Sequence, residues 1–391
     1  METHTEQSVP KFARAVAEAS QKMSGFEATE TVEAGAIRVV ARIGFRRPEQ
    51  IAVEYQTYVS PILELEERLT GDVEYTPGEL VGLSLHSEGQ RTWLYDPSAG
   101  VCVVKSSRSL HEPLPDAPVL GEIEYLRDLP HDYLVRDLGI ETIDDRDARV
   151  LSLKPKRPHR IHAFKAVAFL ARKASVALDA ETLFPVRLRF SPSVASQTYR
   201  LLGPNNDVTV RYSEVRTTSD ALPPLEPPDG TRIFREESIS IDELEDRLPF
   251  PISLDPFHHA GCESLDGRAL LAEDADNDRA FCSAAFLNAS EGTPDDAGLI
   301  TLRAGNYLSR NMARRRVAAS ERGEELTIEA RSARFLDRRN LWEELAAGVD
   351  PSQAPCELSW EQDGVFWFLV GVKGERSVLE RIAAHLMTGT A

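Results

Sequence analysis

The sequence has no long apolar run. A helix that crosses a membrane needs roughly 18 or more consecutive apolar residues, and no stretch of the 391 residues approaches that length. The first residues, METHTEQSVPKFARAVAEAS, also lack the apolar core of a secretory signal peptide. We therefore expect no membrane-spanning helix. The protein is either cytoplasmic or an exported protein whose signal has been removed, and the sequence does not choose between them.

Cysteine is scarce. The four cysteines are scattered at positions 102, 262, 282 and 356, and no two of them form a C-x-x-C pair. Zinc sites usually take thiolates from such closely spaced pairs, so we expect no zinc site. Buried free thiols are the favoured interpretation, and a Cys262–Cys282 disulfide stays open for an oxidising compartment.

Basic charge is in deficit. The chain has 45 basic residues, only 8 of them lysines, against 63 acidic residues, which gives a net charge of −18 and a pI near 5.0. Proteins that bind nucleic acid through its phosphates usually carry a basic surface. The balance therefore argues against a nucleic-acid partner and favours a soluble, mutually repelling molecule.

Catalytic and metal-binding signatures are also missing. The sequence contains no G-x-S-x-G, no Walker loop, no dinucleotide fingerprint and no H-E-x-x-H. Residues 274, 276 and 278 are aspartates that resemble the start of a calcium loop, but the sixth position lacks glycine and the twelfth is Ala285. The adjacent His258 and His259 would point to opposite sides of an extended segment. We therefore expect a non-enzymatic protein without cofactor or metal.

Alternation of apolar and polar residues is the strongest feature present. Before the break Arg46-Arg47-Pro48, apolar residues occupy every second position, and after it the same parity continues. This period of two predicts half-buried strands, and proline fits the seam because it cannot donate to a strand ladder. The apolar positions are Ile37, Val39, Ala41, Ile43, Phe45, Ile51, Val53 and Tyr55.

Similar strands recur along the chain, separated by turn residues. The pattern predicts hairpins over 90–104 and 175–190, a strand over 208–216, helices over 10–23 and 62–70, and a short helix within 118–137. Later strands are expected at 297–303, 324–331 and 356–372, followed by a helix over 376–387. Short antiparallel strands predict a curved sheet or partial barrel. We therefore expect an α+β protein, mainly antiparallel β, with residues 1–235 as one domain and 236–391 as a smaller α+β domain.

The order of these segments resembles a known family. Residues 10–235 are similar to the periplasmic lipoprotein carriers of LolA type and to the related RseB/MucB regulators. The segments that carry the resemblance are SGFEA at 24–28, FRRP at 45–48, VEY at 53–55, GQRTWLYDP at 89–97, LKP at 153–155, LDAETLFPVRL at 178–188 and PPDG at 227–230. The resemblance implies an incompletely closed antiparallel β-barrel with plugging helices and an apolar cavity for acyl chains. The interval between Tyr55 and Gly89 is longer than the carriers need, so the lid region is expected to be rebuilt.

The resemblance also implies a function and a site. Arg47 matches a position beside the lid of the carriers, although an exposed arginine at a strand end explains it equally. The apolar residues that alternate on the strands would line the cavity or simply fill a core: Ile43, Phe45, Val53, Tyr55, Trp93, Tyr95, Val176, Leu178, Val186 and Leu188. The implied function is binding of lipid or of lipoprotein acyl chains outside the cytoplasm. The alternatives are an RseB-like sensor whose second domain binds a partner protein, such as a membrane-anchored regulator, and a barrel that is only a scaffold.

Overall fold

The computed structural model forms two compact units that are interleaved along the chain. It describes residues 8–46, 50–89, 91–106, 133–155, 171–192, 207–218, 220, 222, 226–274, 276, 278–288, 298–345, 353–372 and 376–388. Unit 1 comprises residues 1–62, 77–97 and 107–226, and unit 2 comprises residues 63–76, 98–106 and 227–391. The domain boundary expected after residue 235 stays a prediction.

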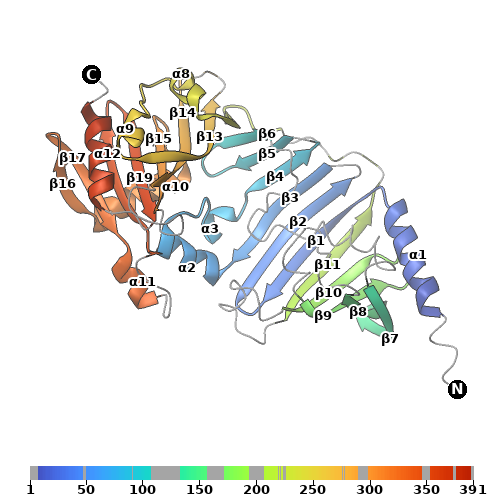
Figure 1. Ribbon diagram of the computed structural model, residues 1–391. Helices are drawn as coiled ribbons and strands as arrows, with labels where there is room; N and C mark the ends of the chain where they lie inside the picture. The colour runs from blue at the N-terminus through green and yellow to red at the C-terminus, as the bar shows by residue number, and fades with distance from the viewer. Residues whose placement is uncertain are drawn as a thin grey trace. The chain divides into compact units, whose positions relative to one another are not determined.

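Unit 1 is built on an antiparallel sheet of ten strands (Figure 1). The order is β5-β4-β3-β2-β1-β11-β10-β9-β8-β7. Among the described strands the end strands β5 and β7 do not pair with each other, so the expected incompletely closed antiparallel barrel is confirmed. The strands are β1 (Gly25–Ala34), β2 (Ile37–Arg46), β3 (Gln50–Val59), β4 (Ser84–Glu88), β5 (Arg91–Asp96), β7 (Tyr133–Ile143), β8 (Arg146–Pro155), β9 (Ala171–Asp179), β10 (Pro185–Pro192) and β11 (Val208–Thr217).

Turn chemistry closes the hairpins of this sheet. Between β9 and β10, the Asp179 side chain accepts hydrogen bonds from the backbone N–H groups of Glu181 and Thr182, at 3.1 and 2.8 Å. The predicted hairpin over 175–190 is therefore confirmed. The short helix expected within 118–137 does not include residues 133–137, which begin β7, and residues 118–132 lie outside the described part of the chain.

Helix α1 (Ser8–Lys22) covers one end of the unit 1 sheet (Figure 1). Its buried side carries Ala13, Val16 and Ala17, which recur at helical spacing. The Phe12 ring lies 4.2 Å from the guanidinium carbon of Arg149 on β8, and the helix packs against β7. The short helix α3 (Pro77–Leu80) packs on β3.

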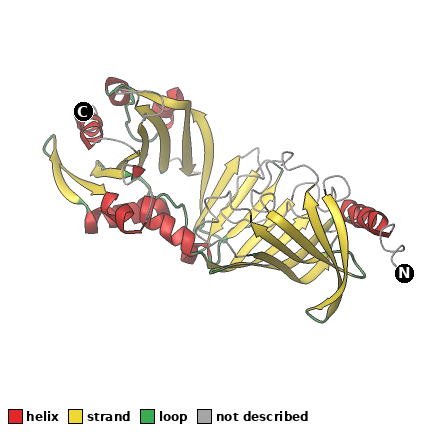
Figure 2. Ribbon diagram, turned by 60° about the horizontal axis from the view of Figure 1, so that its bottom comes forward, coloured by secondary structure: helices red, strands yellow, loops and turns green. Residues whose placement is uncertain are grey.

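The strands of unit 2 lie edge to edge, with helices on both faces of this part of the sheet (Figure 2). Its order is β6-β12-β13-β14-β15-β19-β18-β17-β16, antiparallel except for the parallel pair β6–β12. The strands are β6 (Val101–Ser106), β12 (Arg232–Ser240), β13 (Cys262–Asp274), β14 (Ala280–Asn288), β15 (Gly298–Gly305), β16 (Glu324–Ile328), β17 (Arg331–Asp337), β18 (Cys356–Gln362) and β19 (Val365–Val372). The helices are α2 (Pro61–Thr70, in unit 2 from Leu63), the 3-10 turn η1 (Ile241–Glu243), α8 (Leu244–Arg247), α9 (Asp255–His259), α10 (Arg310–Arg322), α11 (Arg339–Leu345) and α12 (Arg376–Thr388).

One face of the unit 2 sheet forms its apolar core. Helix α12 contributes Leu379, Ile382 and Leu386, which pack with residues of β14, β15, β18 and β19 in one cluster. The indole rings of Trp360 and Trp367 stack there with centroids 5.7 Å apart. The predicted terminal helix and the predicted hairpin over 356–372 are both confirmed.

The other face holds residues 63–76, a segment that the chain inserts between β3 and β4. The Asn311 side chain donates to the carbonyl oxygens of Gly71 and Val73, at 2.9 Å each. The Trp342 indole donates to Leu69 O at 2.8 Å. These bonds hold residues 69–73, which are part of the unusually long interval between Tyr55 and Gly89, within unit 2.

Arginines of α10 and β15 add charge to this attachment. Arg315 bonds Glu357, and both side chains are 1% exposed. Arg315 also reaches Asp72 at 3.1 Å, and Arg303 bonds the same carboxylate. Because a buried ion is stable only when it is paired, the buried Arg315 needs these carboxylates, and its bond to Asp72 ties the segment to α10.

The cysteines are free and buried, as predicted. Cys262 lies opposite Asn288 and Cys282 lies opposite Leu271 in the β13–β14 register, so the two thiols are far apart along the ladder. The disulfide left open for this pair is therefore not formed.

Candidate functional site

The unit 1 sheet carries a continuous row of aliphatic side chains on one face. Directly opposed residues on neighbouring antiparallel strands share a face. The register links six of them across six strands, in the order Val39, Val32, Val210, Leu188, Val176 and Leu151. We call the face that carries this row the apolar face.

Aromatic rings extend the apolar face beyond this row. Phe26 lies opposite Phe45, with ring centroids 5.7 Å apart. The Phe184 ring packs edge-on against Phe26 at 5.1 Å and against Tyr212 at 5.8 Å. Rings from β1, β2 and β11 therefore meet with that of Phe184, which lies in the β9–β10 turn.

Three polar side chains interrupt the apolar face. Tyr55 lies opposite Ala41, Ala41 lies opposite Glu30, and Glu30 lies opposite Tyr212, so the carboxylate has a phenol on each side across the sheet. All three polar side chains are buried and engaged within the protein. A buried carboxylate needs hydrogen-bonding partners, and these groups give the face one region that can bond a polar atom.

The register brings together seven of the ten predicted lining residues. Five of them project from the apolar face, because each opposes or alternates with a member of the row or of its aromatic extension. They are Phe45, Val53, Tyr55, Leu178 and Leu188. All five are buried, so the chain itself covers them in this structure. Ile43 and Val176 lie on the same face.

The structure places the other predicted lining residues elsewhere. Trp93 opposes His86, which opposes Ala52, and this places Trp93 and Tyr95 on the face opposite to Val53. Val186 packs in a small cluster with Ile143, Ala148, Val150 and Ala177, behind the apolar face. Arg47 lies outside the described residues.

The face opposite to the apolar face is also covered near its centre. A Cβ atom on Gly44 would lie 2.8 Å from a methyl carbon of Leu222 and 3.7 Å from Ala52 Cβ, so Leu222 seals this spot. His86 is buried on the same face, with its ring 5.8 Å from that of Trp93. Burial lowers the pKa of His86, although the nearby Glu88 opposes that shift.

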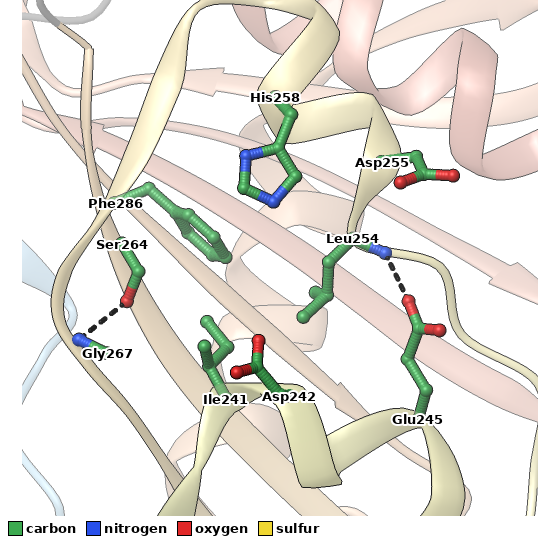
Figure 3. A pocket seen from close by; sticks show the side chains of 9 residues that line it. All are labelled: Ile241, Asp242, Glu245, Leu254, Asp255, His258, Ser264, Gly267 and Phe286. Atoms are coloured by element: carbon green, nitrogen blue, oxygen red, sulfur yellow. Dashed lines mark hydrogen bonds between the residues drawn. The ribbon is translucent and has the colours of Figure 1, made fainter.

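Unit 2 has a pocket of about 460 Å³ beside the turn that joins β12 to β13. Figure 3 shows the side chains of Ile241, Leu254 and Phe286 directed toward its middle, with the His258 ring entering from the opposite side. Phe286 is fully buried and stacks on Phe257 with centroids 4.0 Å apart, so the floor is rigid. The lining residues are Ile241, Asp242, Glu245, Leu254, Asp255, His258, Ser264, Gly267 and Phe286.

The rim of this pocket is acidic. Asp242 and Asp255 are exposed, and Glu245 accepts a hydrogen bond from Leu254 N at 2.8 Å. The neighbouring Arg247 is held away by Glu237 and Glu273. The pocket therefore suits a positively charged group with an apolar stem. Within the described ranges, no group of His, Cys, Asp and Glu side chains is arranged to hold a metal ion.

Sequence reasoning missed two features of these sites. Glu30 occupies an apolar-face position in the alternation Phe26, Ala28, Glu30, Val32, so a single polar residue on the buried parity was the available signal. The pocket had no such signal, because its residues come from η1, α8, α9, β13 and β14 and meet only in the fold.

Comparison with known proteins gives similarity of fold. No protein-family model matches the chain, and no curated protein does. A LolA superfamily protein from Nitrosomonas europaea is similar over 54% of this chain and 94% of that one, with 15% identity and a TM-score of 0.26. The Mycobacterium tuberculosis lipoprotein LppX is similar over 57% of this chain and 100% of that one, with 11% identity and a TM-score of 0.30. A chain of the Pseudomonas aeruginosa MucA/MucB complex is similar over 96% of this chain and 96% of that one, with 11% identity and a TM-score of 0.30. The chain is thus similar in fold to LolA superfamily proteins, LppX and MucB, as its sequence predicted.

Proposed function

We propose that unit 1 binds a lipid or a lipoprotein acyl chain on its apolar face, without catalysis. The observation that carries the proposal is the unbroken aliphatic row across β2, β1, β11, β10, β9 and β8. Neighbouring strands lie about 4.8 Å apart, so six strands give a row of roughly 24 Å. A strip of that length suits an extended acyl chain.

Binding requires that the cover over the apolar face moves. The row residues other than Val32 are buried, so the structure corresponds to a closed state. Each methylene that a ligand buries contributes about 0.8 kcal/mol. Several methylenes could therefore offset the cost of displacing the cover, and short-chain ligands should bind much more weakly than long ones.

Uptake of a fluorescent acyl probe tests this proposal. Val32 is half-buried and is the second of the six residues in the row, so Val32→Phe should fill the strip without unfolding the sheet. Thr31→Phe is the matched control, since Thr31 is equally buried on the same strand but faces the other way. We expect dansyl-undecanoic acid to bind the full chain, with affinity at least tenfold lower for Val32→Phe and unchanged for Thr31→Phe.

Two outcomes would overturn the proposal. One is equal probe binding by both variants, which would place the ligand elsewhere. The other is an organic extract of natively purified protein that contains no acyl lipid, together with no probe uptake. That result would leave unit 1 as a scaffold. In this proposal the protein works outside the cytoplasm, the compartment implied by the sequence resemblance.

The pocket of unit 2 supports a second candidate function, a regulator that binds a partner protein through this unit. Its apolar floor and its exposed carboxylates Asp242 and Asp255 suit a basic segment of such a partner. A short peptide of alternating leucine and arginine is a direct probe. Binding that weakens with salt and is lost in Asp242→Asn/Asp255→Asn would support this function, and no binding at low ionic strength would count against it.

A further inference from the structure

Strand β7 concentrates exposed apolar side chains. Nine large apolar side chains of the described residues are exposed, and three of them lie on this one strand. Leu134, Leu138 and Ile140 are 56, 55 and 70% exposed. Single exposed apolar residues are ordinary, but a group of them marks a surface that meets a partner or a membrane.

The strand also lies at an end of its sheet. Among the described strands, β7 pairs only with β8, so no other described strand occupies its outer edge (Figure 1). A bulge between Asp137 and Gly139 interrupts the strand, and the Asp137 carboxylate accepts from Gly139 N at 2.9 Å. Such bulges disfavour edge-to-edge pairing with another strand, which argues against a partner that extends the sheet.

The exposed side chains project in different directions. Leu134 opposes Lys154, whereas Ile140 opposes Arg149, and positions 154 and 149 lie on opposite faces of the regular strand β8. A protein partner docked on one face of the sheet would reach only part of this group. An apolar phase that surrounds the edge would take up the side chains from both faces.

The β7–β8 hairpin together with Arg187, its ion-pair partner on β10, is balanced in charge, although the whole chain is strongly acidic. Asp137 pairs with Arg149, and Glu141 pairs with Arg187. The hairpin's remaining charged residues are three basic ones, Arg136, Arg146 and Lys154, and three acidic ones, Asp144, Asp145 and Asp147. A neutral edge on a protein of net charge −18 matches a zwitterionic lipid surface and not an anionic one.

We propose that β7 is a membrane-contact edge, which inserts Leu134, Leu138 and Ile140 shallowly into a zwitterionic lipid surface. Side chains inserted to this depth lie at the boundary between headgroups and acyl chains. Ile140 shares the apolar face with Leu151 and Leu188. An acyl chain that leaves the membrane at this edge would therefore reach the aliphatic row directly.

This inference goes beyond ligand binding, because it can be measured on protein without acyl ligand. The full chain should co-float with phosphatidylcholine vesicles. The triple variant Leu134→Ser/Leu138→Ser/Ile140→Ser should partition at least tenfold less. A matched control removes three exposed aliphatic side chains from other sites, at positions 81, 265 and 317, by substitution with serine, and it should bind vesicles like the wild type.

A label at the edge gives a second measurement that does not depend on the triple variant. The four native cysteines are buried, so Ile140→Cys should be the only thiol that reacts with an NBD maleimide. Its emission should shift to the blue when vesicles are added, while a label on Val81→Cys should not shift. The proposal would be overturned if the wild-type protein did not bind the vesicles. It would also be overturned if both triple variants lost vesicle binding to the same extent. A dimer in vesicle-free solution that the β7 variant abolishes would also overturn it, since β7 would then be a protein interface.

Discussion

Removal of the buried cation Arg315 should destabilise unit 2 strongly. Arg315→Met leaves the Glu357 carboxylate, 1% exposed, without its bonded partner. Breaking one half of a buried ion pair costs about 3–5 kcal/mol. Arg303 and Arg338 still interact with the charge of Glu357, which favours the lower end, about 3 kcal/mol.

A neighbouring residue supplies the control. Arg316 pairs with Glu361 at 3.2 Å, but the two side chains are 54 and 48% exposed. Exposed pairs contribute up to about 1 kcal/mol, so Arg316→Met should change the free energy of unfolding by no more than about 1 kcal/mol. The double variant Arg315→Met/Glu357→Gln should recover part of the loss, because it leaves no unpaired charge at the site.

Urea unfolding followed by tryptophan fluorescence measures these differences. Three of the four tryptophans, Trp342, Trp360 and Trp367, lie in unit 2, so the signal reports mainly on this unit. If Arg315→Met loses no more stability than Arg316→Met, the pair is solvated in solution and the reasoning on the buried network fails.

Three further predictions concern the core, the thiols and pH. Leu188→Ala should lower the free energy of unfolding by about 2–5 kcal/mol, because it leaves a cavity on the apolar face; urea titration checks this. Burial raises the pKa of Cys282 to about 12, and Ellman's reagent at pH 8 should find no reactive thiol until the protein is unfolded. Burial lowers the pKa of His86. The unfolded chain therefore binds a proton more readily, so stability should fall as pH drops through the ordinary histidine pKa of about 6.5 towards the folded value. In His86→Gln the urea midpoint should depend less on pH in this range, and an unchanged dependence would contradict the assignment.

Alternation predicted most of the strands because each of them has one buried side. β2 is the clearest case, since every second residue from Ile37 to Phe45 is apolar and three of the positions between and after them are arginines. Alternation failed for the start of β7, where Leu134 and Val135 are both apolar and the consecutive pair resembles part of a helix. The reason is visible in the fold, because this end strand exposes apolar residues that a strand within a sheet would not.

The lining of the candidate site was harder to predict than the strands. Alternation divides the residues of each strand between the two faces of the sheet. Only the pairing of neighbouring strands decides which residues of different strands share a face. Trp93 and Phe45 ended on opposite faces because β4, a short strand with weak alternation, sets the register between β3 and β5. The network of Arg315 was beyond reach, since it joins residues 243 positions apart along the chain.

The insertion of residues 63–76 into unit 2 has a consequence for how the protein is made. The chain passes between the two units five times, after residues 62, 76, 97, 106 and 226. During synthesis the segment that ends at Thr76 and the strand β6 emerge early, yet the side chains that hold them belong to α10, β12, β15 and β18. Contacts of such long range slow folding. A nascent chain must therefore wait for its last third before unit 2 can close. The C-terminal fragment from residue 236 would lack β6 and Asp72, so Arg303 and Arg315 would lose the carboxylate that they share.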